Sequence, residues 1–368
     1  MNFDWQPHTR LVFGANSAER VGELARELGG KKVLLVTDPG IITAGHAARA
    51  QESLAAAGFA VTIYGNCREN PTTKDVDACL VVARTAQADL IVAVGGGSSM
   101  DTAKGANFLL TNGGRMQDYQ GIGKATRPML PFIAIPTTAG TGSECQSFSL
   151  IADEQTHQKM ACGDPKAAAR VAILDPLLTL TQPSRVAACT GIDAIAHAVE
   201  TAVTRKRTAL SWLYSREAFK LTAENLPRVL ESPQNIEARA AMQLGAAHAG
   251  TAIENSMLGA VHSAANPLTA HFGIVHGHAV GLMLPAVVRF NAVDTPTKAL
   301  YDQLSPRLGD LLDDLFARTK LPKKLSDCGV PSTAIPKLAE EAARQWTAQF
   351  NPRPVKVADF IKLYEVIL

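Results

Sequence analysis

Histidine is concentrated in the second half of this sequence. Six of the nine histidines lie between residues 197 and 278, at positions 197, 248, 262, 271, 276 and 278. Asp193 and His197 are four residues apart in a stretch with helical periodicity, so both side chains should project from the same helix face. A carboxylate and an imidazole placed in this way can bind one divalent cation. The simpler alternative is an Asp–His pair on a helix surface.

Apolar neighbours favour the metal interpretation. Residues 192, 194, 195, 196 and 198 are all Ala or Ile, and a buried carboxylate is costly unless it is paired or metal-bound. His262 and His276 also lie in apolar stretches, just before or within predicted helices. Together with the first pair they would make a site of three histidines and one aspartate. Taken singly, each of the two is better explained as a hydrogen-bonded core histidine, which is also the default interpretation of His248, His271 and His278.

Two loops rich in glycine and hydroxyl groups follow predicted strands. Gly95–Gly97 and Ser98 come directly after an apolar strand, and we expect a helix from about Thr102. Glycines allow the backbone to approach a ligand, and the following helix offers free amides to an anion such as a pyrophosphate. The second loop, 137–144, carries a hydroxyl or glycine at six of its eight positions. Neither loop matches the G-x-G-x-x-G fingerprint or a P-loop, so plain connecting turns are the alternative.

Asp38 ends an earlier predicted strand and precedes Pro39-Gly40. An acidic residue at this place can accept a hydrogen bond from a ribose 2′-hydroxyl and repel a 2′-phosphate. Asp-Pro-Gly is also ordinary turn chemistry, so Asp38 alone does not decide between these interpretations.

The elements that must position these residues follow from periodicity. We expect strands at 11–13, 32–37, 59–64, 89–94, 132–135 and 170–174, alternating with helices at 17–28, 47–57 and 73–86. This alternation is typical of a Rossmann-like α/β domain, with a mostly parallel sheet and helices on both faces. Alanine-rich helical periodicity then dominates at 194–203, 209–226, 235–253 and 280–291, and Pro183 suits a helix start. We therefore predict an α/β domain over residues 1–180 and an all-α domain over residues 181–368.

Composition excludes several other classes of protein. The 368 residues are 46% hydrophobic and 19% charged, which suits two globular domains with large cores. A net charge of +2 and 5% aromatic residues do not favour nucleic-acid binding. Apolar stretches are too short to span a membrane, and the N-terminus does not resemble a secretory signal. The six cysteines are scattered singly, as in proteins of the reducing cytoplasm, where we expect this chain.

The motifs, in this order, resemble those of the iron-containing (group III) alcohol dehydrogenases. The similarity spans essentially the whole chain. The matching segments are Gly95–Ser98 with Asp101–Lys104, Pro136–Glu144, Gly191–Ala194 with His197, and His276–Gly277. Within the family the chain looks most similar to the lactaldehyde reductase and 1,3-propanediol dehydrogenase type. The resemblance implies a dehydroquinate synthase-like architecture, with a nucleotide domain, a helical domain and a metal in the cleft between them.

The resemblance also assigns roles to single residues. Asp193, His197, His262 and His276 match the ligands of one divalent metal, with Fe²⁺ as the first expectation and Zn²⁺ as the alternative. The positions that match cofactor-binding residues are Asp38, Asn70, Gly96, Gly97, Ser98, Asp101, Thr137, Thr138, Thr141 and Lys159. Asp38 matches the residue that favours NAD(H) over NADP(H). Members of the family are homo-oligomers, usually built on a dimer, and we expect the same here.

Two positions depart from the family pattern. Asn266 stands where many members have a second histidine four residues after the third ligand, and Gln146 replaces a hydroxyl residue after the threonine loop. The first position lies near the nicotinamide and the substrate. We expect Asn266 to orient one of them without acid–base chemistry, because an amide does not titrate. The proton would then leave through water, the cofactor ribose or a residue such as His271.

The resemblance implies a metal-dependent, NAD(H)-linked alcohol dehydrogenase, or aldehyde and ketone reductase. Hydride would pass directly between a small substrate and the nicotinamide, with the substrate oxygen on the metal. Maleylacetate reductase and hydroxyacid–oxoacid transhydrogenase activities of the same family are alternatives. A lyase of the sugar-phosphate cyclase type is disfavoured because few cationic residues surround the proposed ligands. A non-catalytic cofactor-binding protein is disfavoured because all four ligand positions are filled.

Overall fold

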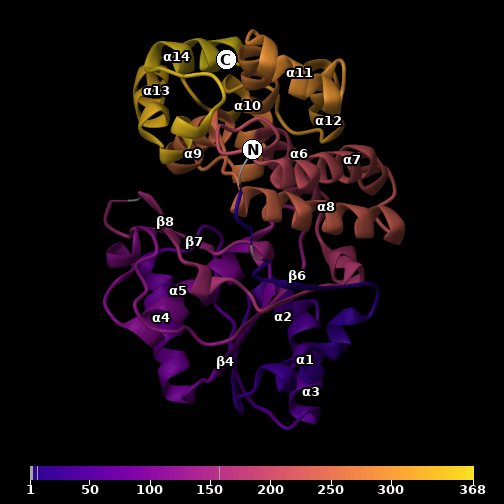
Figure 1. Ribbon diagram of the computed structural model, residues 1–368, viewed down its shortest axis with the longest axis vertical. Helices are drawn as coiled ribbons and strands as arrows, with labels where there is room; N and C mark the ends of the chain where they lie inside the picture. Colours follow the sequence, from indigo (N-terminus) through magenta and orange to yellow (C-terminus); the bar gives the residue numbers. More distant parts are fainter. Residues whose placement is uncertain (1–2, 6, 157) are drawn as a thin grey trace. The chain divides into compact units, whose positions relative to one another are not determined.

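The computed structural model describes residues 3–5, 7–156 and 158–368 (Figure 1). Met1, Asn2, Gln6 and His157, which belong to the predicted α/β domain, lie outside the described residues. Three of them are part of the N-terminal segment in which we expect no secretory signal. The chain forms two compact units. The α/β unit comprises residues 7–138 and 142–182, and the helical unit comprises residues 183–368 with the short segments 3–5 and 139–141. The division at Gln182 lies beside the predicted boundary at 180.

The α/β unit is built on a six-stranded sheet in which all neighbouring strands are parallel. The strand order is β1 (Arg10–Phe13), β9 (Val171–Leu174), β6 (Phe132–Pro136), β4 (Leu90–Gly95), β2 (Lys32–Val36) and β3 (Ala60–Tyr64). Strand β4 is buried along its whole length, which explains its continuous apolar sequence. The predicted parallel α/β fold is therefore confirmed.

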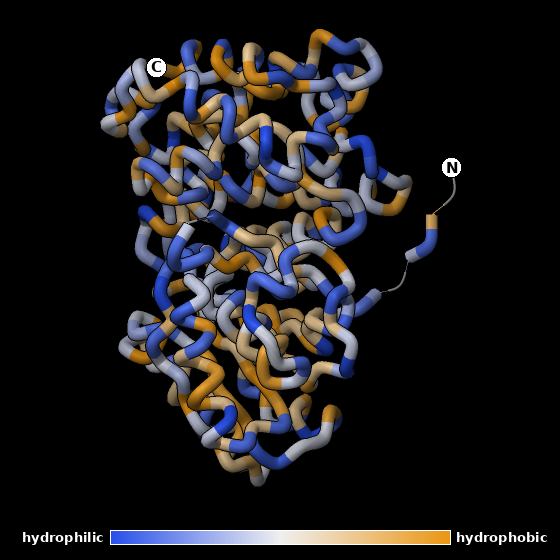
Figure 2. Tube along the Cα trace, turned by 90° about the vertical axis from the view of Figure 1, so that its left-hand side faces the viewer, coloured by the Kyte–Doolittle hydropathy of each residue, from blue (hydrophilic) through white to orange (hydrophobic). Residues whose placement is uncertain are grey.

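Helices cover both faces of this sheet because successive strand residues point to opposite sides. Val33 and Leu35 pack with α1 (Val21–Leu28) and α3 (His46–Ala56), whereas Leu34 and Val36 pack with α4 (Thr73–Ala86) and α5 (Gly97–Asn112). The hydrophobic segments of Figure 2 run through the interior of this unit. Shorter helical pieces complete the layers: η1 (Ser17–Arg20), α2 (Pro39–Thr43), η2 (Met116–Tyr119), η3 (Ser143–Cys145), η4 (Pro165–Ala167) and η5 (Pro176–Thr181).

A second, three-stranded sheet was not predicted. Its order is β5 (Gly121–Ile122), β8 (Lys159–Gly163) and β7 (Phe148–Ala152), with β7 and β8 antiparallel. The strands are short, and β8 contains Lys, Ala and Gly, which are weak strand formers. They form because Ile151, Met160 and Cys162 close a small core with Phe108 of α5. Local propensity gave no signal for this tertiary contact.

The helical unit packs its helices around α6 (Ser184–Thr201) and α10 (His276–Asn291). Its other helices are α7 (Ala209–Glu231), α8 (Ile236–Glu254), α9 (Ala260–Phe272), α11 (Thr295–Leu304), α12 (Leu308–Arg318), α13 (Ile335–Arg344) and α14 (Val357–Val366), with the short turns η6 (Ser326–Cys328), η7 (Ser332–Ala334) and η8 (Trp346–Phe350). Pro183 is the N-cap of α6, close to the predicted start. Small residues allow close helix contacts: a Cβ on Gly277 would lie 2.0 Å from the carbonyl oxygen of Cys189. The predicted all-α second half is confirmed.

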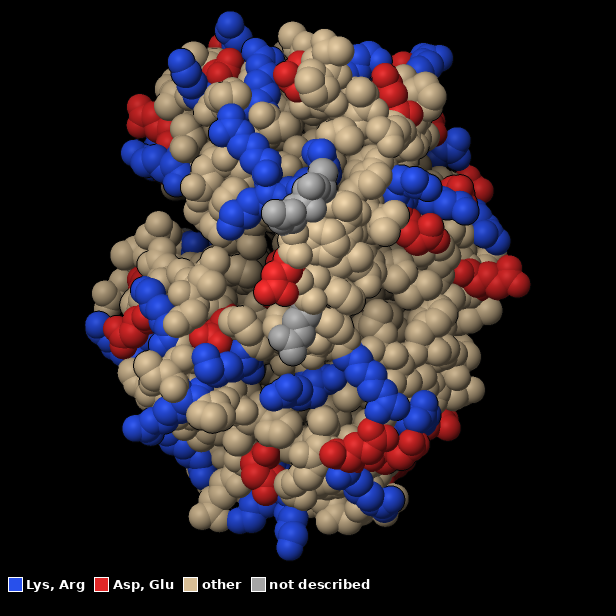
Figure 3. Space-filling view, in the orientation of Figure 1, with Lys and Arg blue, Asp and Glu red and all other residues tan. Residues whose placement is uncertain are grey.

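The surface and the cysteines are unremarkable for a globular protein. On the face drawn in Figure 3, Lys and Arg side chains lie among Asp, Glu and uncharged residues. All six cysteines are free, and five of them are buried. Among the described residues there is no helix whose length and apolar character would suit it to crossing a bilayer.

His46 should make the stability of the protein depend on pH. The side chain is buried, and its Nε2 lies 2.8 Å from the hydroxyl of Thr181. Burial lowers the pKa of His46 below its usual 6.5, so the unfolded chain takes up the proton first. The contribution of this residue is complete above about pH 6.5 and is lost as the pH falls below that value.

We therefore expect His46→Gln to reduce the slope of the free energy of unfolding between pH 7 and pH 5, by at most about 1.4 kcal/mol per pH unit. Denaturant titrations of both proteins at several pH values measure this slope. His8→Gln, at an exposed position, serves as the control. Equal slopes for all three proteins would contradict the assignment to His46.

Candidate functional site

Four side chains from three helices converge in the helical unit. Asp193 and His197 lie one turn apart on α6, His262 is in the first turn of α9, and His276 begins α10. The Nε2 atoms of His197, His262 and His276 lie 3.6, 3.5 and 4.0 Å from Oδ1 of Asp193. The structure thus brings together all four residues that the sequence predicted as metal ligands.

The spacing of these atoms suits one divalent cation. Metal–ligand bonds of about 2.0–2.2 Å place the corners of a tetrahedron roughly 3.4 Å apart. Asp193, His262 and His276 each offer a ligand atom, and these three atoms lie within 4.8 Å of one another. Oδ1 of Asp193 and Nε2 of His262 are buried and accept or donate no hydrogen bond within the described part of the chain. A bound cation would satisfy both atoms.

The charge distribution at this site also favours a cation. Burial raises the pKa of the Asp193 carboxyl, but the surrounding imidazoles outweigh burial and hold this pKa well below its usual range. Burial lowers the pKa of His197. Burial also acts to lower the pKa of His262, but the carboxylates of Glu200 and Asp193 raise it to about 9. The carboxylates of Asp193 and Glu200 therefore make positive charge favourable at this buried site.

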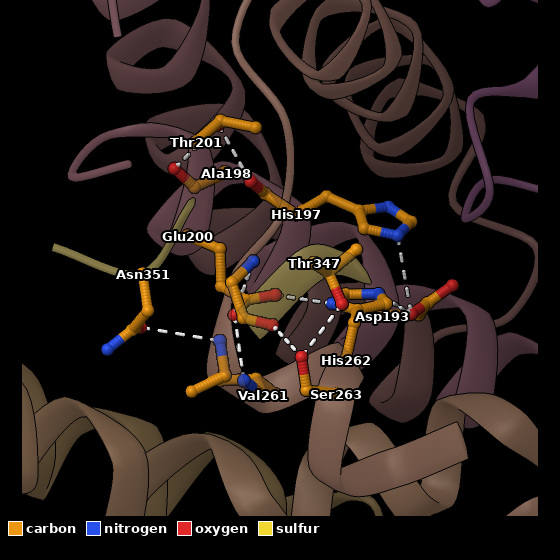
Figure 4. A network of polar contacts seen from close by, with 12 residues as sticks. Asp193, His197, Ala198, Glu200, Thr201, Val261, His262, Ser263, Thr347 and Asn351 are labelled. Carbon is orange, nitrogen blue, oxygen red and sulfur yellow. Dashed lines mark hydrogen bonds and ion pairs between the residues drawn. The ribbon is translucent and has the colours of Figure 1, made fainter. Parts of the chain in front are cut away.

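Glu200 anchors one of these imidazoles (Figure 4). Its Oε2 accepts a hydrogen bond from Nδ1 of His262, and its Oε1 accepts from the backbone N–H groups of Gly259 and Val261 at 3.1 and 2.8 Å. With Nδ1 engaged in this way, Nε2 is the ring nitrogen that faces Asp193, at 3.5 Å from Oδ1. A carboxylate behind a histidine is the usual arrangement in metal sites, because it fixes the ring and its tautomer.

His197 is oriented by a backbone carbonyl. Its Nδ1 lies 3.3 Å from the carbonyl oxygen of Gly140, which can only accept a hydrogen bond, so Nδ1 carries the proton and Nε2 is left as the ligand atom. Glycine is required at position 140, since a Cβ there would lie 2.5 Å from Cβ of Thr190. The His197 ring stacks on that of His262 with 4.8 Å between centroids.

Helix α9 is held in place by three further hydrogen bonds. The hydroxyls of Ser263 and Thr347 lie 2.7 Å apart, and the hydroxyl of Tyr364 donates to the carbonyl of Ala264 at 2.7 Å. The side-chain oxygen of Asn351 accepts from the N–H of Ala260 at 3.3 Å. Segments near the C-terminus thus fix the helix that carries His262.

The first predicted cofactor loop and the start of the second, Thr137 and Thr138, lie side by side in the α/β unit. We call residues 95–98 the glycine loop and residues 137–142 the threonine loop. Strands β4 and β6 are neighbours, the N–H of Thr137 donates to the carbonyl of Gly95 at 3.0 Å, and a Cβ on Gly96 would lie 3.5 Å from Cγ2 of Thr138. Both loops therefore leave the carboxyl edge of the sheet at adjacent positions, where open α/β sheets bind ligands.

Helix α5 begins earlier than predicted. Gly96 is its N-cap, and Gly97 and Ser98 belong to its first turn, whereas the sequence suggested a start near Thr102. The prediction was late because glycine is a poor helix former. The early start strengthens the anion-site interpretation, since the first four N–H groups of a helix have no partner within it.

The sequence left open whether Asp38 is a turn residue or a cofactor-binding residue, and its position in the structure is compatible with both. Its Oδ1 caps α2 by accepting from the N–H of Ile41 at 3.1 Å, so the expected turn is a short helix. Its Oδ2 accepts from the hydroxyl of Ser99 at 3.4 Å. The carboxylate is therefore both a helix cap and a neighbour of the glycine loop.

The remaining predicted cofactor residues are more dispersed. Asp101 accepts from the hydroxyl of Ser143 at 3.0 Å; burial raises the pKa of its carboxyl, and the charges of Lys104 and Lys159 oppose that rise. Thr141 belongs to segment 139–141 of the helical unit. Asn70 has a left-handed backbone (φ 52°) in the exposed turn before α4. Their roles in binding stay predictions.

The two predicted catalytic residues both lie on α9. Asn266 is one turn after His262, and its Nδ2 donates to Oε1 of Gln345 at 3.2 Å. His271 is exposed near the end of the helix, with its Nε2 2.6 Å from Oε2 of Glu341. The structure does not include His271 in the cluster around Asp193. Catalytic roles for both residues remain predictions.

Sequence reasoning missed Glu200. The signal was present, because Asp193, His197 and Glu200 occupy positions i, i+4 and i+7 and therefore share one helix face. A carboxylate in that third position is the natural partner for a ligand histidine from another helix.

Comparisons with known proteins agree with this geometry. Family profiles described as "Iron-containing alcohol dehydrogenase" and "Fe-containing alcohol dehydrogenase family, C-terminal" match residues 8–176 and 187–368. The chain is 32% identical to NAD-dependent methanol dehydrogenase of Bacillus methanolicus over 96% of each protein, and 34% identical to 1,3-propanediol dehydrogenase of Klebsiella pneumoniae over 95% of each. A crystal structure of 1,3-propanediol oxidoreductase superposes with a TM-score of 0.96 at 32% identity, covering both chains completely.

Replacing Glu200 should weaken metal binding. In Glu200→Gln the amide group would direct a donor at one of three N–H groups that now donate to the carboxylate. We expect metal affinity to fall by about 10- to 100-fold. Competition with a chelator of known affinity measures this directly. Glu237→Gln, at an exposed position on α8, is the matched control and should keep wild-type affinity; equal affinity of both variants would refute the anchoring role.

Proposed function

Since the chain belongs to the iron-containing alcohol dehydrogenase family and is therefore an oxidoreductase, we propose that it interconverts small alcohols with their aldehydes or ketones by direct hydride exchange with NAD(H). The observation that carries this proposal is the convergence of three imidazole nitrogens on one buried carboxylate oxygen. One divalent cation, Fe²⁺ or Zn²⁺, is the proposed occupant, because nitrogen and carboxylate ligands suit both.

The proposed cation site lies in the helical unit. A cation bound there supplies a Lewis acid that stabilises negative charge developing on the substrate oxygen. Asp193, His197, His262 and His276 would hold it, and Glu200 and the carbonyl of Gly140 would keep two of the rings oriented. Asp193, His197 and His262 are buried, whereas His276 is partly exposed. The low exposure of the first three ligands strengthens electrostatic interactions at the site.

The α/β unit is the proposed binding site for NAD(H). The free N–H groups at the start of α5 suit a pyrophosphate, and Thr137 and Thr138 offer hydroxyls beside them. A relative named as NAD-dependent, identical at 32% of positions, supports the choice of nicotinamide cofactor. Asp38, beside Ser99, is the proposed determinant of NAD(H) over NADP(H).

Asn266 is the proposed substrate- or nicotinamide-orienting residue. It lies one turn from His262, and its amide already uses one donor on Gln345, which leaves a second donor and the acceptor oxygen for a ligand. Proton release would then proceed through water, the cofactor ribose or His271, since an amide cannot titrate. Asn266→Ala should change the relative kcat/KM values among substrates of different size.

Removing the metal should abolish turnover and lower the thermal stability of the protein, because a ligand bound only to the folded state stabilises that state. The experiment follows NADH absorbance with a panel of small alcohols, diols and aldehydes, before and after chelation. Restoration by Fe²⁺ and by Zn²⁺ is then compared. Full activity of a verified metal-free sample with every substrate would overturn the proposed function.

Removing the charge of Asp38 should shift cofactor preference. The structure makes Asp38→Asn the informative variant, because asparagine preserves the cap of α2 while abolishing repulsion of a 2′-phosphate. We expect the ratio of kcat/KM for NADP to that for NAD to rise by roughly tenfold or more. If wild type prefers NADP, or if the variant leaves the ratio unchanged, Asp38 serves only as a helix cap.

A further inference from the structure

We infer that Lys104 is a positioning residue for the cofactor loops. Its buried ammonium group would fix the segment that follows the threonine loop against α5, the helix that begins in the glycine loop. This inference rests on the proposed function, because it takes these loops as the NAD(H) site. It assigns a role to Lys104, the charged residue of the Asp101–Lys104 motif that the sequence did not predict to bind the cofactor.

Lys104 is buried to an unusual degree for a lysine, with 1% of its surface exposed. Its Nζ donates to the carbonyl oxygens of Ser143, Gln146 and Phe148 at 2.6, 2.8 and 3.0 Å, and it lies 3.0 Å from the hydroxyl oxygen of Ser143. The three protons of an ammonium group are thus matched by three converging carbonyls. No neutral side chain offers three donors from a single atom.

Two of the three carbonyls belong to an irregular stretch of chain. Residues 143–147 lie between the threonine loop and β7 and contain the short turn η3, whereas Phe148 is the first residue of β7. Strand pairing does not align Ser143 or Gln146, so their position depends on other contacts. Lys104 gathers them from one point on α5, which explains why a cation is buried here.

Asp101, one turn earlier on α5, completes the connection. The hydroxyl of Ser143 donates to Oδ1 of Asp101 at 3.0 Å, and the hydroxyl of Ser149 donates to the carbonyl of Asp101 at 2.8 Å. Two successive turns of α5 therefore hold both ends of segment 143–149. The charge of Lys104 also opposes the rise in the pKa of the Asp101 carboxyl that burial causes.

The two sides of the threonine loop are thus fixed in different ways. Its entry is aligned by the parallel pairing of β4 and β6 and by the bond from Thr137 to Gly95. Its exit is aligned by Lys104. Without the ammonium group the exit would keep the hydrogen bonds to Asp101 but lose its charged link to α5, the helix whose first turn would bind the pyrophosphate. The spacing between the two loops would then be set less firmly.

Asn107 provides a matched control on the same helix. It is also 1% exposed, and its side chain makes two hydrogen bonds with the backbone of Leu130, at 3.0 and 3.1 Å. Leu130 precedes β6, so Asn107 ties α5 to the end of that strand remote from the loops. Loss of the hydrogen bonds made by either Lys104 or Asn107 should lower the stability of the protein. Loss of Lys104 alone should disturb the cofactor loops.

The experiment compares Lys104→Met with Asn107→Leu. For each protein we would measure the dissociation constant for NADH by fluorescence titration, the melting temperature and the metal content. We expect Lys104→Met to raise the dissociation constant by about tenfold, with metal content unchanged. Asn107→Leu should lower the melting temperature but keep the dissociation constant within about twofold of wild type.

Four other results would overturn the inference or its premise. Equal NADH affinity of wild type and Lys104→Met would refute the positioning role, and an equal loss in both variants would show that Lys104 acts through stability alone. If Lys104→Met does not fold, Ser143→Ala, which removes one acceptor of Lys104 and one donor to Asp101, should weaken NADH binding about threefold with metal content unchanged; unchanged binding there would also refute the positioning role. A wild-type protein that does not bind NADH would instead refute the proposed function.

Discussion

The carboxylate of Glu200 is the contact on which the metal-binding arrangement depends. It lies on α6 with Asp193 and His197, yet all three of its hydrogen bonds go to the start of α9 and to His262. A buried carboxylate is costly unless it is fully hydrogen-bonded. The position of α9 relative to α6 is therefore dictated by the need to bring three N–H groups to one charge, and the ring of His262 is placed as a consequence.

Close helix packing then decides where the other ligands can lie. Gly277 allows the start of α10 to contact Cys189 of α6, and the alanines of α6 leave room for neighbouring helices. A larger residue at position 277, or in place of the alanines of α6, would push the start of α10 away from α6 and so move His276 away from Asp193. The alanine-rich composition that appeared in the sequence as plain helical periodicity is thus also a geometric requirement of the site.

The sequence predicted what depends on local pattern. Helix α4 was placed at its observed bounds, the strands of the large sheet were found within one or two residues, and the four converging side chains were identified by residue type and by resemblance. It missed what depends on contacts distant in the chain. The hairpin of β7 and β8 forms only because α5 offers it a core, and the link from Glu200 to His262 joins residues 62 positions apart. The late start assigned to α5 has a different cause, since propensity alone argues against a helix that begins with glycine.

Glu200 and Lys104 illustrate one principle with opposite charges. The carboxylate gathers backbone N–H groups at the start of a helix, and the ammonium gathers backbone carbonyls at the exit of a loop. Both charges are buried, and buried charges contribute little net stability compared with well-packed apolar residues of the same size. What they provide is a defined position, because an ion with several fixed partners tolerates few arrangements of the backbone around it. Each lies beside a segment proposed to bind a ligand, so the presence of these two costly groups is better explained by ligand geometry than by stability of the fold.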